Sequence, residues 1–319
     1  MIASLADESA LLLELRQLSE RGDYRAIADR LATIDAPEIA ARTPLALLAA
    51  EAHGRLGELP VAERWATSAL ERARAAGDQY SEQRALNHRG IIALESGDAA
   101  AAERWFAEAL ELSPDPILQA RAFNNLAVLA DLRGAPFVAL ASYRLALAAY
   151  QQAGQVRGMA ETQHNIAISR LHGGDLAGAL AAADEAVRLA TQLDDDRLGA
   201  QALAGRAEMH VANGDPELAA AELERAGATY KRLRNPVGLS EVFRLEAYVA
   251  SARGDHAAAA RRLDEAAAQA REGESAHTLA EIERDRAATL EALGDSAGAE
   301  AARQRARDLY RRLGRADPF

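Results

Sequence analysis

A glycine that recurs about every 40 residues constrains this 319-residue chain more than any other feature. The steps between successive glycines are 35, 40, 37, 40, 40, 40 and 40 residues. Most of them are followed by aspartate, and each lies between two stretches rich in alanine and leucine. The series is Gly22, Gly57, Gly97, Gly134, Gly174, Gly214, Gly254 and Gly294. A fixed period of this length is typical of a solenoid, in which each unit buries its apolar face only by stacking on its neighbours.

Small residues recur at three fixed distances from these turn glycines. From the second repeat to the eighth, alanine stands five and twelve residues after the glycine. Seven residues before it the chain has Ala50, Gly90, Ala127, Ala167, Ala207, Ala247 and Ala287. Small side chains at such positions allow two helices to approach closely. The glycine is suited to the left-handed conformation that ends a first helix, and the following aspartate is suited to capping the second.

This pattern predicts an all-α chain of about eight helical hairpins, without strands. We expect first helices near 8–20, 41–55, 79–95, 117–132, 156–172, 197–212, 237–252 and 276–292. Second helices are expected near 24–34, 59–75, 99–112, 136–152, 176–192, 216–232, 256–271 and 296–313. Repeat 1, about 5–36, has Leu15 and Ile27 where other repeats have small residues, so we interpret it as an atypical N-terminal cap. Repeats 2–8 cover about 37–315, and we expect residues 1–319 to form a single superhelix.

Composition excludes several functional classes. The net charge of −11 argues against nucleic acid as a partner, because phosphate binding needs the opposite balance. The chain has no cysteine, so thiolate zinc sites and disulfides are excluded. The N-terminal stretch does not read as a signal peptide, and no run of 18 apolar residues predicts a membrane span. We therefore expect a soluble cytoplasmic protein with no membrane contact.

No catalytic or metal-binding pattern is apparent. The seven histidines do not form an i, i+4 pair with a nearby carboxylate, as a helix-borne zinc site requires. Phosphate-binding loops, nucleophile elbows and Ser/His/Asp arrangements are also missing from the sequence. We expect the protein not to be an enzyme and to use no cofactor and no metal.

The repeat resembles the tetratricopeptide repeat (TPR) family, and the resemblance covers essentially the whole chain. It implies a right-handed α-solenoid whose first helices line a concave groove. The family's early tryptophan is missing here, its aromatic residue nine positions after the turn survives only as Phe106 and Tyr143, and its closing proline only as Pro114. A unit longer than the usual 34 residues is similar to kinesin light chain and to several bacterial TPR regulators.

Residues nine and ten before the turn glycine are implied by this resemblance to project into the groove. There the sequence has three polar pairs, Asn87-His88, Asn124-Asn125 and His164-Asn165. By resemblance to the asparagine-bearing helices of kinesin light chain, Asn125 and Asn165 would hydrogen-bond the main chain of an extended peptide. An amide is suited to this role because it both donates and accepts. The alternative is that these amides connect neighbouring repeats or contact only water.

Arginines add a basic contribution to the same face. Arg244 and Arg284 stand ten residues before their turn glycines, and Arg84 and Arg121 stand one turn earlier, at minus thirteen. Their guanidinium groups suit a ligand with carboxylates. The alternative is pairing across repeats with Glu161, Glu241 and Glu281, which occupy the minus-thirteen position elsewhere. Gly205 marks a place where either a partner's residue or a neighbouring helix can approach.

Together these features predict a non-catalytic adaptor or scaffold that binds a protein or an extended peptide segment. The alternative is a sensor or regulatory TPR module that responds to a signal peptide or a small effector. The arginine-rich last helix leaves weak self-association open, with the N-terminal end of another copy as one contact. The candidate ligand-binding residues are Arg84, Asn87, His88, Arg121, Asn124, Asn125, His164, Asn165, Arg244 and Arg284.

Overall fold

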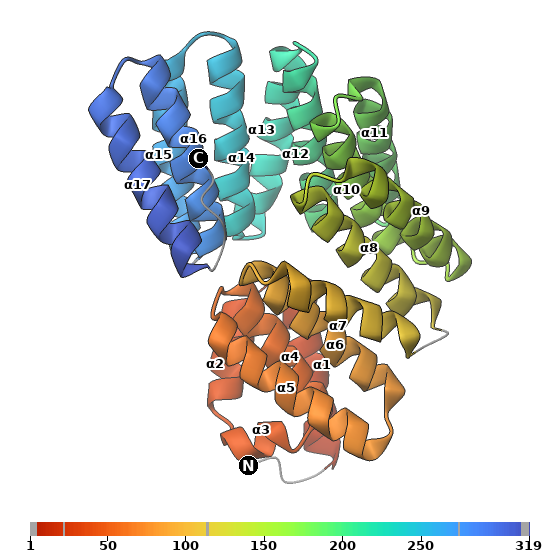
Figure 1. Ribbon diagram of the computed structural model, residues 1–319. Coiled ribbons are helices and arrows are strands. Elements are labelled where there is room, and N and C mark those ends of the chain that lie inside the picture. The colour runs from red at the N-terminus through yellow and green to blue at the C-terminus, as the bar shows by residue number, and fades with distance from the viewer. Residues whose placement is uncertain (1–4, 22, 113–114, 274, 314–318) are drawn as a thin grey trace. The chain divides into compact units, whose positions relative to one another are not determined.

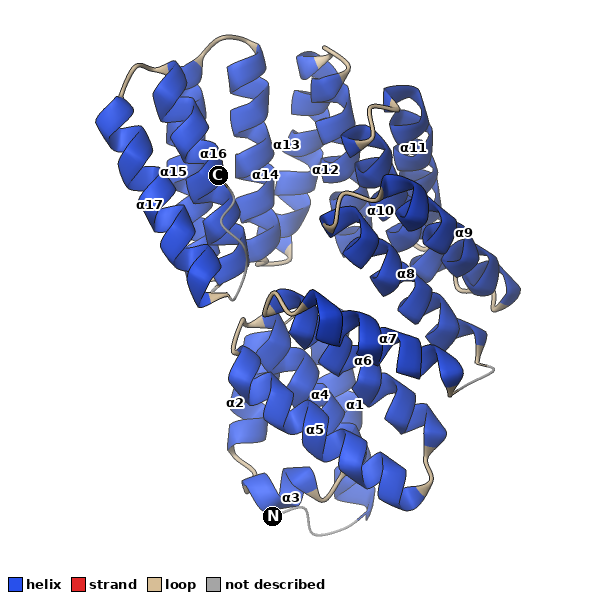
Figure 2. Ribbon diagram, viewed as in Figure 1, coloured by secondary structure: helices blue, strands red, loops and turns tan. Residues whose placement is uncertain are grey.

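The computed structural model describes residues 5–21, 23–112, 115–273, 275–313 and 319. It consists of two units, residues 1–129 (the N-unit) and residues 130–319 (the C-unit), which are described separately. All regular structure in the described residues is helical, as Figure 2 shows. The all-α hairpin fold is therefore confirmed, and one superhelix over residues 1–319 stays a prediction.

The N-unit contains three hairpins and the greater part of a further first helix (Figure 1). A short helix between the first and second hairpins, α3, was not expected from the repeat. The last helix of the unit, α8, continues into the C-unit. The helices are α1 (Leu5–Arg21), α2 (Tyr24–Ala32), α3 (Ala36–Ala40), α4 (Thr43–Arg55), α5 (Leu59–Ala76), α6 (Gln79–Glu95), α7 (Ala99–Glu111) and α8 (Pro116–Leu132).

The C-unit begins at the end of α8, and its described residues form nine further helices. From α10 onward, each first helix packs on the second helix of its own hairpin and on the first helix of the next repeat. The helices are α9 (Pro136–Gln152), α10 (Val156–His172), α11 (Leu176–Gln192), α12 (Asp196–Ala212), α13 (Pro216–Arg232), α14 (Pro236–Ala252), α15 (His256–Glu272), α16 (Ala276–Ala292) and α17 (Ser296–Arg312). These bounds follow the 40-residue period closely.

The small-residue positions are the helix contacts that the sequence predicts. Every alanine five residues after a turn glycine, from Ala62 to Ala299, is completely buried. The positions seven before and twelve after the glycine are buried as well. In the cap, Leu15 and Ile27 are fully buried in a cluster of larger side chains with Leu31 and Leu45. The cap therefore has a core of leucine and isoleucine, where the later repeats use alanine.

The turn chemistry is also as expected, with one exception. All the turn glycines from Gly57 to Gly294 have positive φ, between 69° and 83°, whereas Gly22 lies outside the described residues. Asp98 accepts a hydrogen bond from the backbone amide of Ala101 at 2.9 Å and so caps α7. The second helices of other repeats are capped in the same way, by Asp23, Asp175, Asp255 and Asp295. Asp215 makes no such cap, and Asn213 donates to its carboxylate instead.

Candidate ligand-binding site

Arg84, His88 and Arg121 lie close together on the first helices of the N-unit. Arg84 and His88 are one turn apart on α6, and both are half-buried, whereas Arg121 on α8 is exposed. The guanidinium of Arg84 lies 6.0 Å from the ring centre of Tyr80. The charges that act on His88 are those of Glu51 and Arg55 on α4 together with Arg84 and Arg121. Three helices therefore place charged groups around one imidazole, and Arg16 of α1 acts in turn on Arg84.

The electrostatic environment of this cluster disfavours added positive charge. Burial lowers the pKa of His88 to about 4, and the attraction of Glu51 does not offset this effect. Arg84, Arg121 and Arg55 make smaller contributions to this lowering of the pKa. Burial also lowers the pKa of Arg84, with smaller contributions in the same direction from Arg121 and Arg16. His88 is therefore neutral at pH 7 and sits among cations.

The side-chain amides of these first helices differ in whether they have hydrogen-bond partners. Asn87 is buried, and neither atom of its side-chain amide has a hydrogen-bond partner; the same is true of Gln83, one turn before it. Asn125 is half-buried and makes no hydrogen bond with the described residues, whereas Asn124 already has a partner. Unpartnered buried amides are costly, about 1–3 kcal/mol each.

Replacing His88 by Asn, the residue at the same repeat position on α8, should make the protein less sensitive to acid. In the wild type the unfolded state takes up the histidine proton near pH 6.5 and the native state only near pH 4, so stability falls as the pH drops through this window. Between pH 7 and pH 5 this loss amounts to about 2 kcal/mol. Urea unfolding at both pH values should show a larger loss for the wild type than for His88→Asn. Equal losses would contradict the assignment of His88.

In the C-unit, His164 is used for packing between repeats. Its ring lies against Gly205 of α12, where an added Cβ would stand only 2.5 Å from the imidazole Nδ1 atom. Burial lowers the pKa of His164, opposed by Glu241. Gly205 is therefore the site of a close contact between first helices, the second of the two alternatives left open by the sequence. Asn165, next to His164, is half-buried and has a partner.

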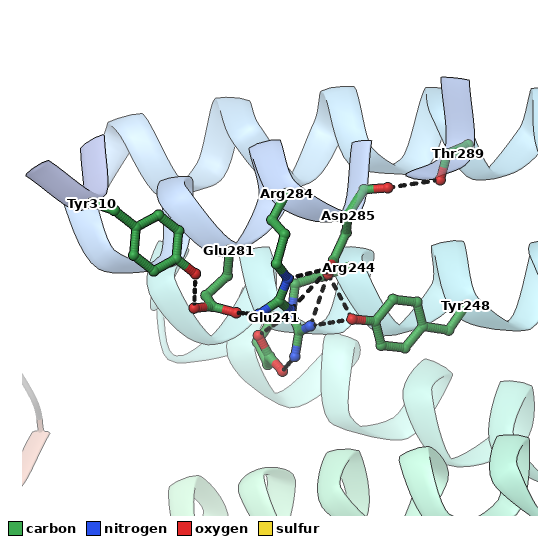
Figure 3. A network of polar contacts seen from close by, with 8 residues as sticks. All are labelled: Glu241, Arg244, Tyr248, Glu281, Arg284, Asp285, Thr289 and Tyr310. Carbon is green, nitrogen blue, oxygen red and sulfur yellow. Dashed lines mark hydrogen bonds and ion pairs between the residues drawn. The ribbon is translucent and has the colours of Figure 1, made fainter. Parts of the chain in front are cut away.

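Arg244 and Arg284 take part in a polar network on α14 and α16, drawn in Figure 3. The carboxylate of Asp285 accepts hydrogen bonds from Arg244 Nη1 at 3.0 Å and from Tyr248 Oη at 2.6 Å. It also accepts two from Arg284, at 3.0 and 3.2 Å. Burial lowers the pKa of Arg244, but the charges of Glu241 and its other partners outweigh this and raise the pKa above its ordinary value.

Two of the three glutamates at the minus-thirteen position pair within their own helices. Glu241 binds Arg244 at 2.5 Å and Glu281 binds Arg284 at 2.5 Å, both with i, i+3 spacing. The expectation that these Arg–Glu pairs cross repeats is therefore wrong for both. Arg244 does cross to the next repeat through a different partner, Asp285.

One register explains the contacts between successive first helices of the C-unit. The residue ten before a turn glycine meets the residue nine before the turn glycine of the next repeat. His164 meets Gly205 in this way, and Arg244 meets Asp285. Ala204 and Leu245, which have the same relation, share one core cluster. In the C-unit these positions therefore connect repeats.

Three charged side chains that interact electrostatically with the candidate residues were not predicted from the sequence: Arg16, Glu51 and Glu208. All three stand six residues before a turn glycine, a position that was not considered as part of the face. Burial raises the pKa of Glu208, while Arg244 lowers it and Glu241 raises it. The signal was present in the sequence, because these charged residues occupy one repeat position. The described residues contain no cluster of three or more groups suited to a metal ion.

The sequence matches no protein-family model and no curated protein. Its structure is similar to that of a Rap protein complexed with Competence and Sporulation Factor, with TM-score 0.65, 14% identity and coverage of 86% of this chain and 78% of that one. It is also similar to BtubC (BKLC) from P. vanneervenii, with TM-score 0.55, 23% identity and coverage of 67% and 91%. A third similar structure is a signal-transduction ATPase from Pyrococcus horikoshii with a tetratricopeptide repeat sensor, with TM-score 0.52, 11% identity and coverage of 79% and 40%.

The chain has the TPR fold. The resemblance inferred from the turn glycines and alanine positions is thus confirmed at the level of fold. The N-unit cluster of Arg84, His88 and Arg121 lies on the first helices of its hairpins, and so does the C-unit network on α14 and α16. The TPR resemblance implies that a ligand binds to first helices. No TPR helix among the described residues is long and apolar enough to cross a membrane.

Proposed function

We propose that this protein is a non-catalytic interaction scaffold that binds an extended polypeptide segment on its first helices. The observation that carries this proposal is a difference between the two units. In the C-unit, Arg244 and Arg284 have internal carboxylate partners. In the N-unit, Arg84, Arg121 and the amide of Asn125 have no hydrogen bond or ion pair with the described residues, and Asn87 is buried without a partner.

The chemistry of these N-unit groups suits a polypeptide. An extended peptide presents one N–H and one C=O per residue, and an asparagine amide can satisfy both. A ligand held in this way gives the half-buried amide of Asn125 a partner, and a rigid helical scaffold presents this amide with little loss of conformational entropy. In this proposal Asn125 binds the main chain of the ligand and Arg84, His88 and Arg121 recognise its side chains. Asn165 and the C-unit arginines support the stack of repeats.

Selection from a random peptide library tests the proposal. Peptides enriched on the wild-type protein should bind Asn125→Ala about tenfold more weakly, which corresponds to one lost hydrogen-bonding group. Asn213→Ala, at an exposed turn, is the control and should leave affinity unchanged. N-methylation of one peptide bond in the ligand should reproduce the loss. Equal affinity of the wild type and Asn125→Ala, with both proteins fully helical, would rule out this mode of binding.

A further inference from the structure

The second helix α9 of the C-unit has an exposed face made of apolar residues. Phe137 is 88% exposed, Val138 is 59% exposed and Leu145 is 52% exposed. Together with the exposed Ala141 and Ala148 they follow the spacing of one side of a helix, and these five residues are called the α9 face. Contiguous apolar surface of this kind marks an interaction site, whereas single exposed apolar residues do not.

The other second helices of the C-unit do not have such a face. Leu145 stands eleven residues after its turn glycine, where each of the others has a charged residue. These residues are Glu185, Arg225, Glu265 and Arg305. Phe137 stands three residues after the turn glycine, where the others have alanine or glutamate. These residues are Ala177, Glu217, Ala257 and Ala297. The apolar face is therefore a property of α9 and not of the repeat.

A groove of about 260 Å³ lies beside the α9 face, lined by residues of α9, α10 and α11. Its apolar lining includes Leu140 and Leu147 of α9, Ile166 of α10 and Ala181 of α11. A cavity of about 150 Å³ holds a benzene molecule, so this groove has room for a phenyl ring. One helix therefore carries both an exposed phenyl ring, that of Phe137, and one wall of a groove that can receive such a ring.

We propose that the α9 face is the interface of a two-fold symmetric dimer, in which Phe137 of each copy enters the groove of the other. A two-fold axis brings the same surface of both copies together, so that surface must be complementary to itself. Two antiparallel α9 helices meet this condition when the axis passes near Ala141, whose small side chain allows close approach. This contact uses a second helix, so it goes beyond the proposed binding of a ligand on first helices.

The charges around α9 also favour a second copy of the chain as the partner. The net charge is −11, so the protein as a whole repels a copy of itself. In contrast, α9 has no acidic residue, and Arg144 is its only charged residue. Glu185 lines the groove, and in the antiparallel pairing it faces the start of α9 of the second copy. No side chain caps that helix end, and the helix dipole favours a carboxylate there.

The size of the contact predicts a weak dimer. It is built mainly from one 17-residue helix of each copy, which places it at or below the lower end of standard interfaces, which bury about 1,200–2,000 Å². We therefore expect the dimer to dissociate in the micromolar range, and the measurement must cover that range.

Sedimentation equilibrium of the full-length protein tests the proposal. The mass of the wild type should double as its concentration rises through the micromolar range. Phe137→Asp should weaken the dimer at least about a hundredfold, because the lost aromatic contact occurs twice across the axis. Leu218→Asp, which places the same charge at an exposed leucine of α13, should leave the dimer unchanged. Both positions are exposed, and circular dichroism establishes that both variants are folded.

A single introduced cysteine tests the geometry, because the chain has no cysteine of its own. In Ala141→Cys the two thiols lie on either side of the axis, so mild oxidation should link the copies by a disulfide. Ala221→Cys provides the matched control, because Ala221 is also exposed and stands at the same repeat position on α13. It should cross-link at least about ten times more slowly.

Four results would overturn the proposal. They are a wild type that stays monomeric throughout the micromolar range, a dimer that Phe137→Asp leaves intact, equal cross-linking of the two cysteine variants, and growth into species larger than a dimer. The last is excluded by a closed two-fold interface. None of them bears on Asn125, so peptide binding to the first helices is tested independently of the dimer.

Discussion

Replacing Phe106 by Ala is expected to lower the free energy of unfolding of the N-unit by about 3–5 kcal/mol. The Phe106 ring is completely buried and lies directly on Gly90, where an added Cβ would be 2.3 Å from a ring carbon. Deleting the ring leaves a cavity that Gly90, without a side chain, does not fill. Urea unfolding followed by circular dichroism measures the loss.

The reciprocal change tests the same contact from the other side. Gly90→Ala forces its new methyl group into the ring and should cost about 1–3 kcal/mol. The double variant Gly90→Ala/Phe106→Ala reproduces the pair that the second repeat has at these positions, Ala50 and Ala66, both of which are buried. It should therefore be more stable than Phe106→Ala alone. Additive losses in the double variant would show that the two residues do not share one packing site.

Replacing Asp285 by Ala is expected to destabilise the C-unit by about 3 kcal/mol. The Asp285 side chain is only 10% exposed and accepts hydrogen bonds from Arg244, Tyr248 and Arg284 (Figure 3). Without it, Arg244, Arg284 and the half-buried phenol of Tyr248 lose their shared acceptor, and the two guanidinium groups keep only Glu241 and Glu281 as carboxylate partners. Thermal unfolding followed by calorimetry measures the effect.

Asp264 provides a matched control for this change. It pairs with Arg286 at 2.7 Å, but its side chain is 72% exposed, so Asp264→Ala should cost less than about 1 kcal/mol. A second comparison uses Arg244→Met/Asp285→Leu, which removes both charges and should be less destabilised than Asp285→Ala alone. If Asp285→Ala and Asp264→Ala prove equally mild, the network contributes little to stability.

Sequence alone predicted the helices and their contacts well, because both follow directly from the period. The alanines at fixed distances from each turn glycine are buried, as in Ala62 and Ala299, and the positive φ of Gly57 and Gly294 follows from the same register. The short helix α3 was missed because it belongs to no repeat. Asp215 was expected to cap a helix, but its carboxylate accepts a hydrogen bond from Asn213 and makes no cap.

The site was predicted less completely than the fold. Residue type and repeat position predicted both Arg84 and Arg244 as ligand-binding residues. The sequence did not show that Arg244 has a carboxylate partner in the folded protein and that Arg84 has none among the described residues. That difference depends on which residue of the next first helix lies opposite, as Asp285 does for Arg244. It depends equally on side chains such as Arg16, which approach from two repeats away. Both are tertiary relations that a single repeat does not encode.

The register between first helices makes the order of repeats in the C-unit specific. His164 needs the bare backbone of Gly205, and Arg244 needs the carboxylate of Asp285. Exchanging the fifth and seventh repeats would place a guanidinium against glycine and an imidazole against aspartate, even though every alanine position would still match. These hairpins are consequently not modular building blocks: duplication, deletion or shuffling of a whole repeat demands compensating changes in the units on either side.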